Sequence, residues 1–192
     1  MAKVLVETSA RHVHVSKEDL EILFGPGATL TEKKRLSQPT EFVSEERVTV
    51  IGPKKELANV SILGPCRKAT QIELSATDAR GIGVKIEVRE SGDISGTPGC
   101  ILRGPHGEIV MKEGVIVAKR HVHMTPDFAK ANGLSNKQTI SLKIEGTGRS
   151  AILSDVICRV DPSFTEAAHI DTDESNAVLA FNGLFGEIIK QL

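Results

Sequence analysis

Apolar and polar residues alternate in many short runs along the chain, and such alternation is typical of half-buried β-strands. Gly, Pro, Asp or Ser bounds each run, as expected where strands end in turns. The segments predicted to be strands are 3–7, 41–51, 56–63, 71–74, 84–89, 99–103, 108–112, 115–119, 138–144 and 149–159. Helical patterns are scarce between these segments, which favours barrels or sandwiches over a parallel α/β sheet.

Short helices are predicted where capping residues occur. Ser16 begins a helix over 17–24, with acidic residues in its first turn and a Gly-Pro-Gly sequence at its end. Thr125 precedes a proline at the first position of a second helix. Asp171 opens a third helix, which is predicted to run towards Ala180.

The chain contains an internal repeat. The sequence SARHVHVS at 9–16 recurs as AKRHVHMT at 118–125, and each copy leads from a strand-like run into a capped helix. We therefore predict a mainly β fold of two related β-barrel domains, each capped by short α-helices. The first domain spans 11–118 and the second 119–192. The polar segment 25–40 is a loop insertion in the first domain, and loops of that length are usually functional or mobile.

The composition excludes several classes of protein. Of the 192 residues, 40% are hydrophobic and 26% are charged, which is typical of a globular protein. The 24 basic and 25 acidic residues give a net charge of −1, whereas binding to nucleic-acid phosphates needs a basic excess. No apolar run has the length of a membrane span, and the N-terminus lacks a signal-peptide pattern. We expect a cytoplasmic protein without nucleic-acid or membrane partners.

Four of the six histidines lie in two His-x-His pairs, His12 with His14 and His121 with His123. In an extended segment, residues i and i+2 project from the same face, so each pair offers two imidazole nitrogens to one zinc ion. Hydrogen bonding within a repeated fold motif is the alternative role for these histidines. The sequence suggests further ligands at His169, before the third helix, and at the carboxylate of Glu73. His106 lies in a turn-like Gly-Pro-His-Gly sequence, where an exposed side chain is expected.

The segment LGPCRK at 63–68 combines a sharp turn with a potential anion-binding group. The guanidinium of Arg67 offers a planar pair of donors to a phosphate or carboxylate, although an ordinary solvated Arg is the alternative. Cys66 lies beside two cations, which would lower the pKa of a thiol. We do not expect Cys66 to be a nucleophile, because no histidine lies next to it in the sequence. The remaining cysteines are too distant for a thiolate zinc site.

Several ordered segments together resemble the PduL-type phosphotransacylases, also called phosphate propanoyltransferases. The resemblance extends over nearly the whole chain. The segments that carry it are SARHVH at 9–14, LSQP at 36–39, EERV at 45–48, LGPCR at 63–67, QIE at 71–73, RHVHMTP at 120–126 and HIDTDESN at 169–176. The resemblance implies two β-barrels capped by short helices, with the N-terminal strand, 1–10, joining the second barrel.

The resemblance also implies two divalent metal ions, normally zinc, and a set of substrate contacts. The positions that match the ligands of one ion are His12, His14 and Glu73. The positions that match the ligands of the other are His121, His123 and His169. Arg67 matches the phosphate-binding arginine. The positions that match contacts to coenzyme A (CoA) are Ser9, Lys34, Leu63, His169 and Asn176.

The reaction implied by the resemblance is the interconversion of a short-chain acyl-CoA plus phosphate with an acyl phosphate plus CoA. Phosphate would attack the thioester directly, so no serine or cysteine nucleophile is needed. A metallohydrolase that uses metal-bound water and a noncatalytic zinc-stabilised binding module are the alternatives. Among partners we expect only small-molecule substrates and a second copy of the chain, in a homodimer or larger homo-oligomer. Family members that enter bacterial microcompartments carry an N-terminal helical extension; the first strand here begins at Lys3, so no shell binding is expected.

Overall fold

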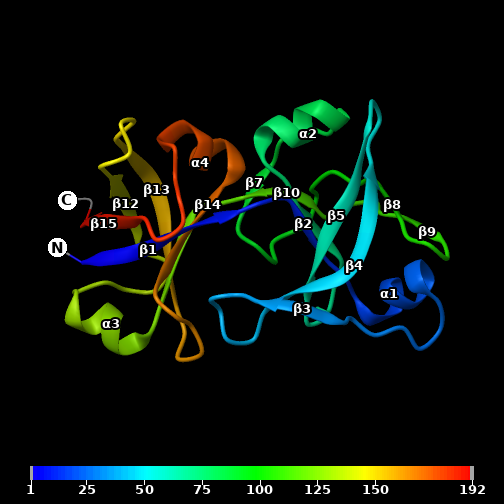
Figure 1. Ribbon diagram of the computed structural model, residues 1–192, viewed down its shortest axis with the longest axis horizontal. Helices are drawn as coiled ribbons and strands as arrows, with labels where there is room; N and C mark the ends of the chain where they lie inside the picture. The colour runs from blue at the N-terminus through cyan, green and yellow to red at the C-terminus, as the bar shows by residue number, and fades with distance from the viewer. Residues whose placement is uncertain (1, 191–192) are drawn as a thin grey trace. The chain divides into compact units, whose positions relative to one another are not determined.

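The computed structural model describes residues 2–190 (Figure 1) and is mainly β, as the sequence predicts. The described chain divides into two compact units. The barrel unit contains the N-terminal strand, residues 37–39 and the chain from Lys119 onward, and the sheet unit contains the rest. None of the helices in the described part of the chain has the length and apolar character needed to span a membrane.

Six strands close into a barrel in the first unit. Their order is β1 (Lys3–Ser9), β14 (Ala167–Asp171), β11 (His121–Met124), β13 (Ala151–Val160), β12 (Thr139–Ile144) and β15 (Phe185–Lys190). The N-terminal strand closes the barrel, because β1 pairs in parallel with β14 and antiparallel with β15. The largest fully buried side chains of this core are Met124, Ile140, Leu142, Ile144 and Ile170. The helices of this unit are α3 (Pro126–Ala131) and α4 (Thr172–Val178).

The second unit is built on a nine-stranded sheet. Its strand order is β7 (Val88–Arg89), β10 (Val115–Ala118), β6 (Gln71–Glu73), β2 (His12–His14), β5 (Glu56–Gly64), β4 (Phe42–Ile51), β8 (Ile101–Arg103) and β9 (Glu108–Val110), with β3 (Glu32–Arg35) paired to β4. The helices are α1 (Lys17–Phe24) and α2 (Ala76–Ile82). The largest fully buried side chains are Leu20, Leu23, Ile62, Ile72, Ile82 and Leu102.

The helix starts predicted from capping residues are confirmed. The Ser16 hydroxyl accepts a hydrogen bond from a backbone N–H in the first turn of α1, and Thr125 does the same for α3. Asp171 begins α4 in a complete capping box with Glu174. The end of this last helix was predicted too late, because Leu179 adopts a left-handed conformation that stops the helix at Val178.

The sequence pattern does not predict helix α2. The helix begins after Ser75, whose hydroxyl accepts a hydrogen bond from the backbone N–H of Asp78. It ends at Ile82, and its C-cap, Gly83, has the positive φ that glycine adopts readily. These capping residues were the available signal, but a helix of two turns is too short to show a clear apolar period.

Several strands also differ from the prediction. Of the predicted strand 84–89, only Val88–Arg89 (β7) forms a strand. Strand β3 lies in the segment that is expected to be an irregular loop. All four residues of β3 are exposed, so no apolar alternation marks this strand. The strand β14 has adjacent buried alanines, and β15 has Gly186 at a buried position, so neither shows the expected pattern.

Candidate metal centres

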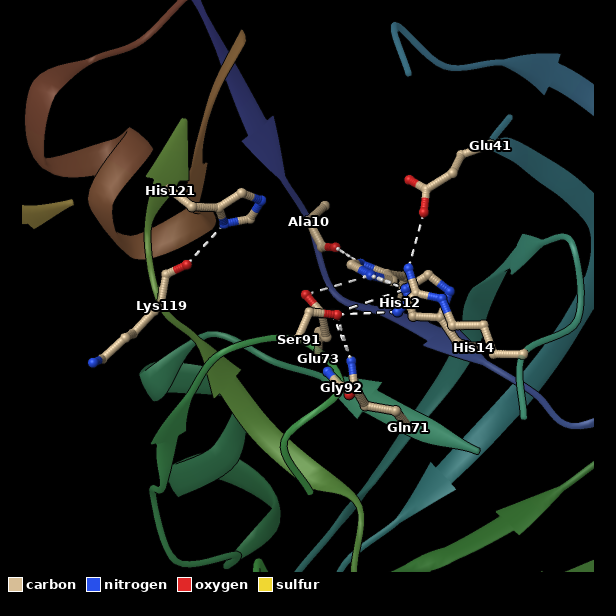
Figure 2. Close-up of polar contacts among 11 residues, drawn as sticks. Ala10, His12, His14, Glu41, Gln71, Glu73, Ser91, Gly92, Lys119 and His121 are labelled. Carbon is tan, nitrogen blue, oxygen red and sulfur yellow. Dashed lines mark hydrogen bonds and ion pairs between the residues drawn. The ribbon is translucent and has the colours of Figure 1, made fainter. Parts of the chain in front are cut away.

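The first His-x-His pair forms the short central strand β2, and both of its imidazoles are buried. The Nδ1 of His12 lies 2.8 Å from the carbonyl oxygen of Ala10. Because a carbonyl oxygen only accepts, this nitrogen carries the proton and leaves the lone pair on Nε2. That Nε2 lies 3.2 Å from Nε2 of His14, so the two rings converge on one point (Figure 2).

The third member of this cluster is Glu73, which lies directly opposite His12 in the antiparallel pairing of β6 with β2. Its carboxylate oxygens lie 3.6 Å from the Nε2 of His12 and 3.8 Å from the Nε2 of His14. Two tetrahedral ligands at zinc–ligand distances of about 2.0–2.1 Å are roughly 3.3 Å apart. The donor set and its spacing therefore fit a zinc ion held by two imidazoles and one carboxylate.

Electrostatics favour the ligand forms of these side chains. Burial raises the pKa of Glu73, but the neighbouring histidines, the Ser91 hydroxyl and Arg67 outweigh it and bring the pKa to about 2. Burial lowers the pKa of His14 well below its ordinary value, and the adjacent His12 ring and the Arg67 guanidinium lower it further. At neutral pH this part of the site therefore holds a carboxylate anion beside a neutral His14 imidazole, which are the forms that bind a metal ion.

A hydrogen-bond network holds the carboxylate of Glu73 in place. The hydroxyl of Ser91 and the side-chain amide of Gln71 each donate to its Oε1, both at 2.7 Å. The backbone N–H of Gly92 in turn donates to Oε1 of Gln71 at 2.7 Å (Figure 2). Sequence reasoning did not single out Ser91, because a serine in a turn carries no signal of a distant partner.

Arg67 is joined to the same network. Its Nη1 donates to the Ser91 hydroxyl at 3.0 Å, and its Nη2 donates to Oε1 of Glu41 at 2.9 Å. About a third of the Arg67 side chain is exposed, so an anion from solvent has access to the guanidinium. The structure therefore places a cationic group with free access to solvent anions one hydroxyl away from Glu73. Glu41 was not predicted.

The second His-x-His pair forms strand β11 of the barrel and makes an equivalent arrangement. The Nδ1 of His121 lies 2.9 Å from the carbonyl oxygen of Lys119, again two residues earlier (Figure 2). His169 on β14 lies directly opposite His121 in the antiparallel pairing. The ring centroids of His121, His123 and His169 lie 4.7 to 5.0 Å apart. Three imidazoles around one point are a recognised zinc-ligand set.

The structure divides the positions matched to CoA contacts between the two units. Ser9, His169 and Asn176 belong to the barrel unit, at the end of β1, in β14 and in α4. Lys34 and Leu63 belong to the sheet unit, where Lys34 is exposed on β3 and Leu63 is half-buried on β5. These CoA contacts stay predictions.

The two remaining candidates from the sequence are His106 and Cys66, and for Cys66 the expected lowering of the thiol pKa by neighbouring cations is wrong, because burial outweighs it. His106 is exposed in its turn, outside both clusters of possible ligands in the described residues. Cys66 is half-buried, and burial raises the pKa of its thiol. A raised pKa keeps this thiol protonated at neutral pH, which is the opposite of an activated nucleophile.

Comparison with known proteins identifies one family that matches most of this chain. A family model described as phosphate propanoyltransferase matches residues 5–180. A phosphate propanoyltransferase of Listeria monocytogenes is 48% identical over 188 residues, which cover 98% of this chain and 88% of the relative. Enzymes with the same description from Enterococcus faecalis and Leptotrichia buccalis are 49% and 50% identical, over 96% and 97% of this chain and 87% and 88% of their own length.

Proposed function

The chain belongs to the phosphate propanoyltransferase family and is an acyltransferase, and from this premise we propose how its two clusters carry out the reaction. The proposed reaction interconverts a short-chain acyl-CoA plus phosphate with an acyl phosphate plus CoA. We propose one zinc ion at His12, His14 and Glu73 and a second at the three histidines of the barrel. The observation that carries the proposal is the hydrogen-bonded connection from Arg67 through Ser91 to Glu73.

Arg67 supplies the binding site for the attacking phosphate. Its guanidinium is a planar, permanently charged group with paired N–H donors that match two phosphate oxygens. Ser91 orients this group beside the first cluster, while Glu41 occupies its other edge. Holding phosphate at a fixed position converts a bimolecular encounter into a reaction between neighbours. An incoming phosphate replaces the carboxylate of Glu41 at one edge of the guanidinium.

The chemical step then needs no covalent enzyme intermediate. A phosphate oxygen attacks the thioester carbonyl carbon, a new C–O bond forms, and the C–S bond breaks to release CoA as a thiolate. When bound, zinc supplies Lewis-acid stabilisation of the charge that develops on the carbonyl oxygen or the departing sulfur. The chain's own part is to keep Glu73 anionic, to keep the lone pair of His12 directed into the site and to hold phosphate at Arg67.

Release of CoA with and without phosphate tests the proposed function. We expect acetyl-, propionyl- and butyryl-CoA to release CoA only when inorganic phosphate is present, with acyl phosphate formed in equal amount. A metallohydrolase would release CoA from water alone, and a noncatalytic zinc module would release none. Either result would contradict the proposal. We also propose that acetyl-CoA is the main substrate, and the relative rates on the three substrates test this preference.

Cys66 provides a test of direct attack. We expect the Cys66→Ser variant to retain most of the wild-type rate, because the raised pKa of the thiol and the direct attack of phosphate leave the sulfur no chemical role. Steady-state rates and mass spectrometry after mixing with acyl-CoA give the readout. Complete loss of activity, together with an acylated wild-type enzyme, would favour a covalent route instead.

Our remaining proposals concern the domain bounds, the cellular location and the oligomeric state of the chain. We propose the two domains as 11–118 and 119–192, the latter with strand 1–10. We also propose a location in the cytoplasm and assembly into a homodimer or larger homo-oligomer. Light scattering of the purified chain measures the oligomeric state directly.

A further inference from the structure

Two histidines of the barrel cluster, His121 and His169, differ in the group that lies next to the Nδ1 atom of the ring. The Nδ1 of His121 lies within hydrogen-bond distance of a backbone carbonyl oxygen, that of Lys119, at 2.9 Å. The Nδ1 of His169 instead faces a side chain, because Oε2 of Glu7 lies 3.7 Å from it. This separation is longer than a hydrogen bond, so the contact is electrostatic. None of the roles proposed above involves this Glu7 carboxylate.

Strand pairing places Glu7 at this position. Strand β1 runs parallel to β14, and Glu7 is the register partner of His169. Register partners on neighbouring strands project from the same face of a sheet, with their backbones about 4.8 Å apart. The Glu7 side chain is 29% exposed, so water screens its charge less than it screens the charge of a surface glutamate.

A second contact fixes the Glu7 carboxylate. The hydroxyl of Ser37 donates to the same Oε2 at 2.5 Å. Ser37 is itself anchored, because the next residue, Gln38, makes two hydrogen bonds to the backbone of Thr165, at 3.1 and 3.2 Å. Gln38 is buried, and residues 37–39 belong to the barrel unit. The segment therefore presents the Ser37 hydroxyl to Glu7 in a fixed orientation.

We propose that Glu7, held by Ser37, is a positioning residue that directs His169 towards the metal of the three-histidine cluster. A negative charge beside Nδ1 favours the tautomer with its proton on that nitrogen, which leaves the lone pair on Nε2 for the metal. The same charge makes the imidazole a stronger donor to a cation, as carboxylates behind zinc-bound histidines do. The inference rests on the proposed metal at this cluster and adds a residue that tunes its affinity.

Zinc affinity tests the proposal without measuring acyl transfer. In a parent chain that carries His12→Ala, competition with a chromophoric chelator reports on the three-histidine cluster. We expect Glu7→Gln to weaken zinc binding about 10- to 100-fold, the usual effect of losing such a supporting partner. Ser37→Ala should also weaken zinc binding. Ser37→Thr keeps the hydroxyl, so its zinc affinity should stay close to that of the parent chain. Glu187→Gln makes the same chemical change on β15, which also pairs with β1, and should have no effect.

A reciprocal measurement separates positioning from a general loss of structure. In a parent chain that carries His121→Ala, Glu7→Gln should leave the zinc affinity of the His12 cluster unchanged. Equal weakening in both parents, or unchanged affinity at the three-histidine cluster, would overturn the role of Glu7. Failure of the His12→Ala parent to bind any zinc would instead overturn the metal centre itself, and the positioning role with it.

Discussion

Replacing His12 or His121 with Ala is expected to remove one of two bound metal ions and most of the acyl-transfer activity. Each histidine is one of three proposed ligands in its cluster, and the remaining two would not hold zinc at comparable affinity. Loss of a supporting partner behind a ligand already costs about 10- to 100-fold, so loss of a ligand should lower kcat/KM by at least about 100-fold. Elemental analysis should find about two zinc ions per wild-type chain and about one in each variant.

His106→Ala is the matched control for these substitutions. It removes the same imidazole from an exposed turn outside both clusters, so metal content and kcat/KM should stay at wild-type values. Wild-type activity in a protein that elemental analysis shows to be free of metal would contradict the model of two metal centres. Full activity in one of the two variants, His12→Ala or His121→Ala, would contradict a catalytic role of the cluster that it changes but not of the other cluster.

Replacing Arg67 with Ala is expected to raise the KM for phosphate about 10- to 100-fold, while the KM for acyl-CoA changes little. A charge-assisted hydrogen-bond pair contributes about 1.5–3 kcal/mol, which sets this range. Arg67→Lys keeps the charge but loses the planar pair of donors, so its KM for phosphate should lie between the two. Metal content should not change, because Arg67 is not one of the proposed ligands.

A substitution of Glu41 is the control, because it should change the KM for phosphate in the opposite direction. The Glu41 carboxylate accepts a hydrogen bond from Nη2 of Arg67 at 2.9 Å, at the edge of the guanidinium where we propose that phosphate binds. Glu41→Gln removes that competing charge, so the KM for phosphate should fall rather than rise. An unchanged KM for phosphate in Arg67→Ala would reject the assignment of this arginine. A rise in Glu41→Gln would show that the carboxylate orients the guanidinium more than it competes for it.

The amino-acid sequence alone determined much of the local structure of this protein. Alternating apolar residues specify most strands because successive side chains of a strand project to opposite faces. Ser16, Thr125 and Asp171 specify helix starts because their side chains satisfy the free N–H groups of a first turn. The His-x-His pairs indicated shared ligand sites for the same local reason, and their repetition indicated two related halves.

Family resemblance supplied what local patterns did not. The residue pattern offered Glu73 and His169 only as candidates, since carboxylates are common and a single histidine is a weak signal. The structure shows what qualifies them, because each lies directly opposite the first histidine of its pair. In both units the third proposed ligand therefore occupies the same register position, although one is a carboxylate and the other an imidazole.

Only the tertiary structure decided which distant residues support these clusters. Ser91 and Glu41 reach Arg67, and Ser37 reaches Glu7, across chain separations that no periodic pattern spans. The physical reason is that the register of the strands and the paths of the loops depend on the packing of the whole core. Helix caps and the two-residue period of a strand depend only on neighbours along the chain, which is why the sequence determines them by itself.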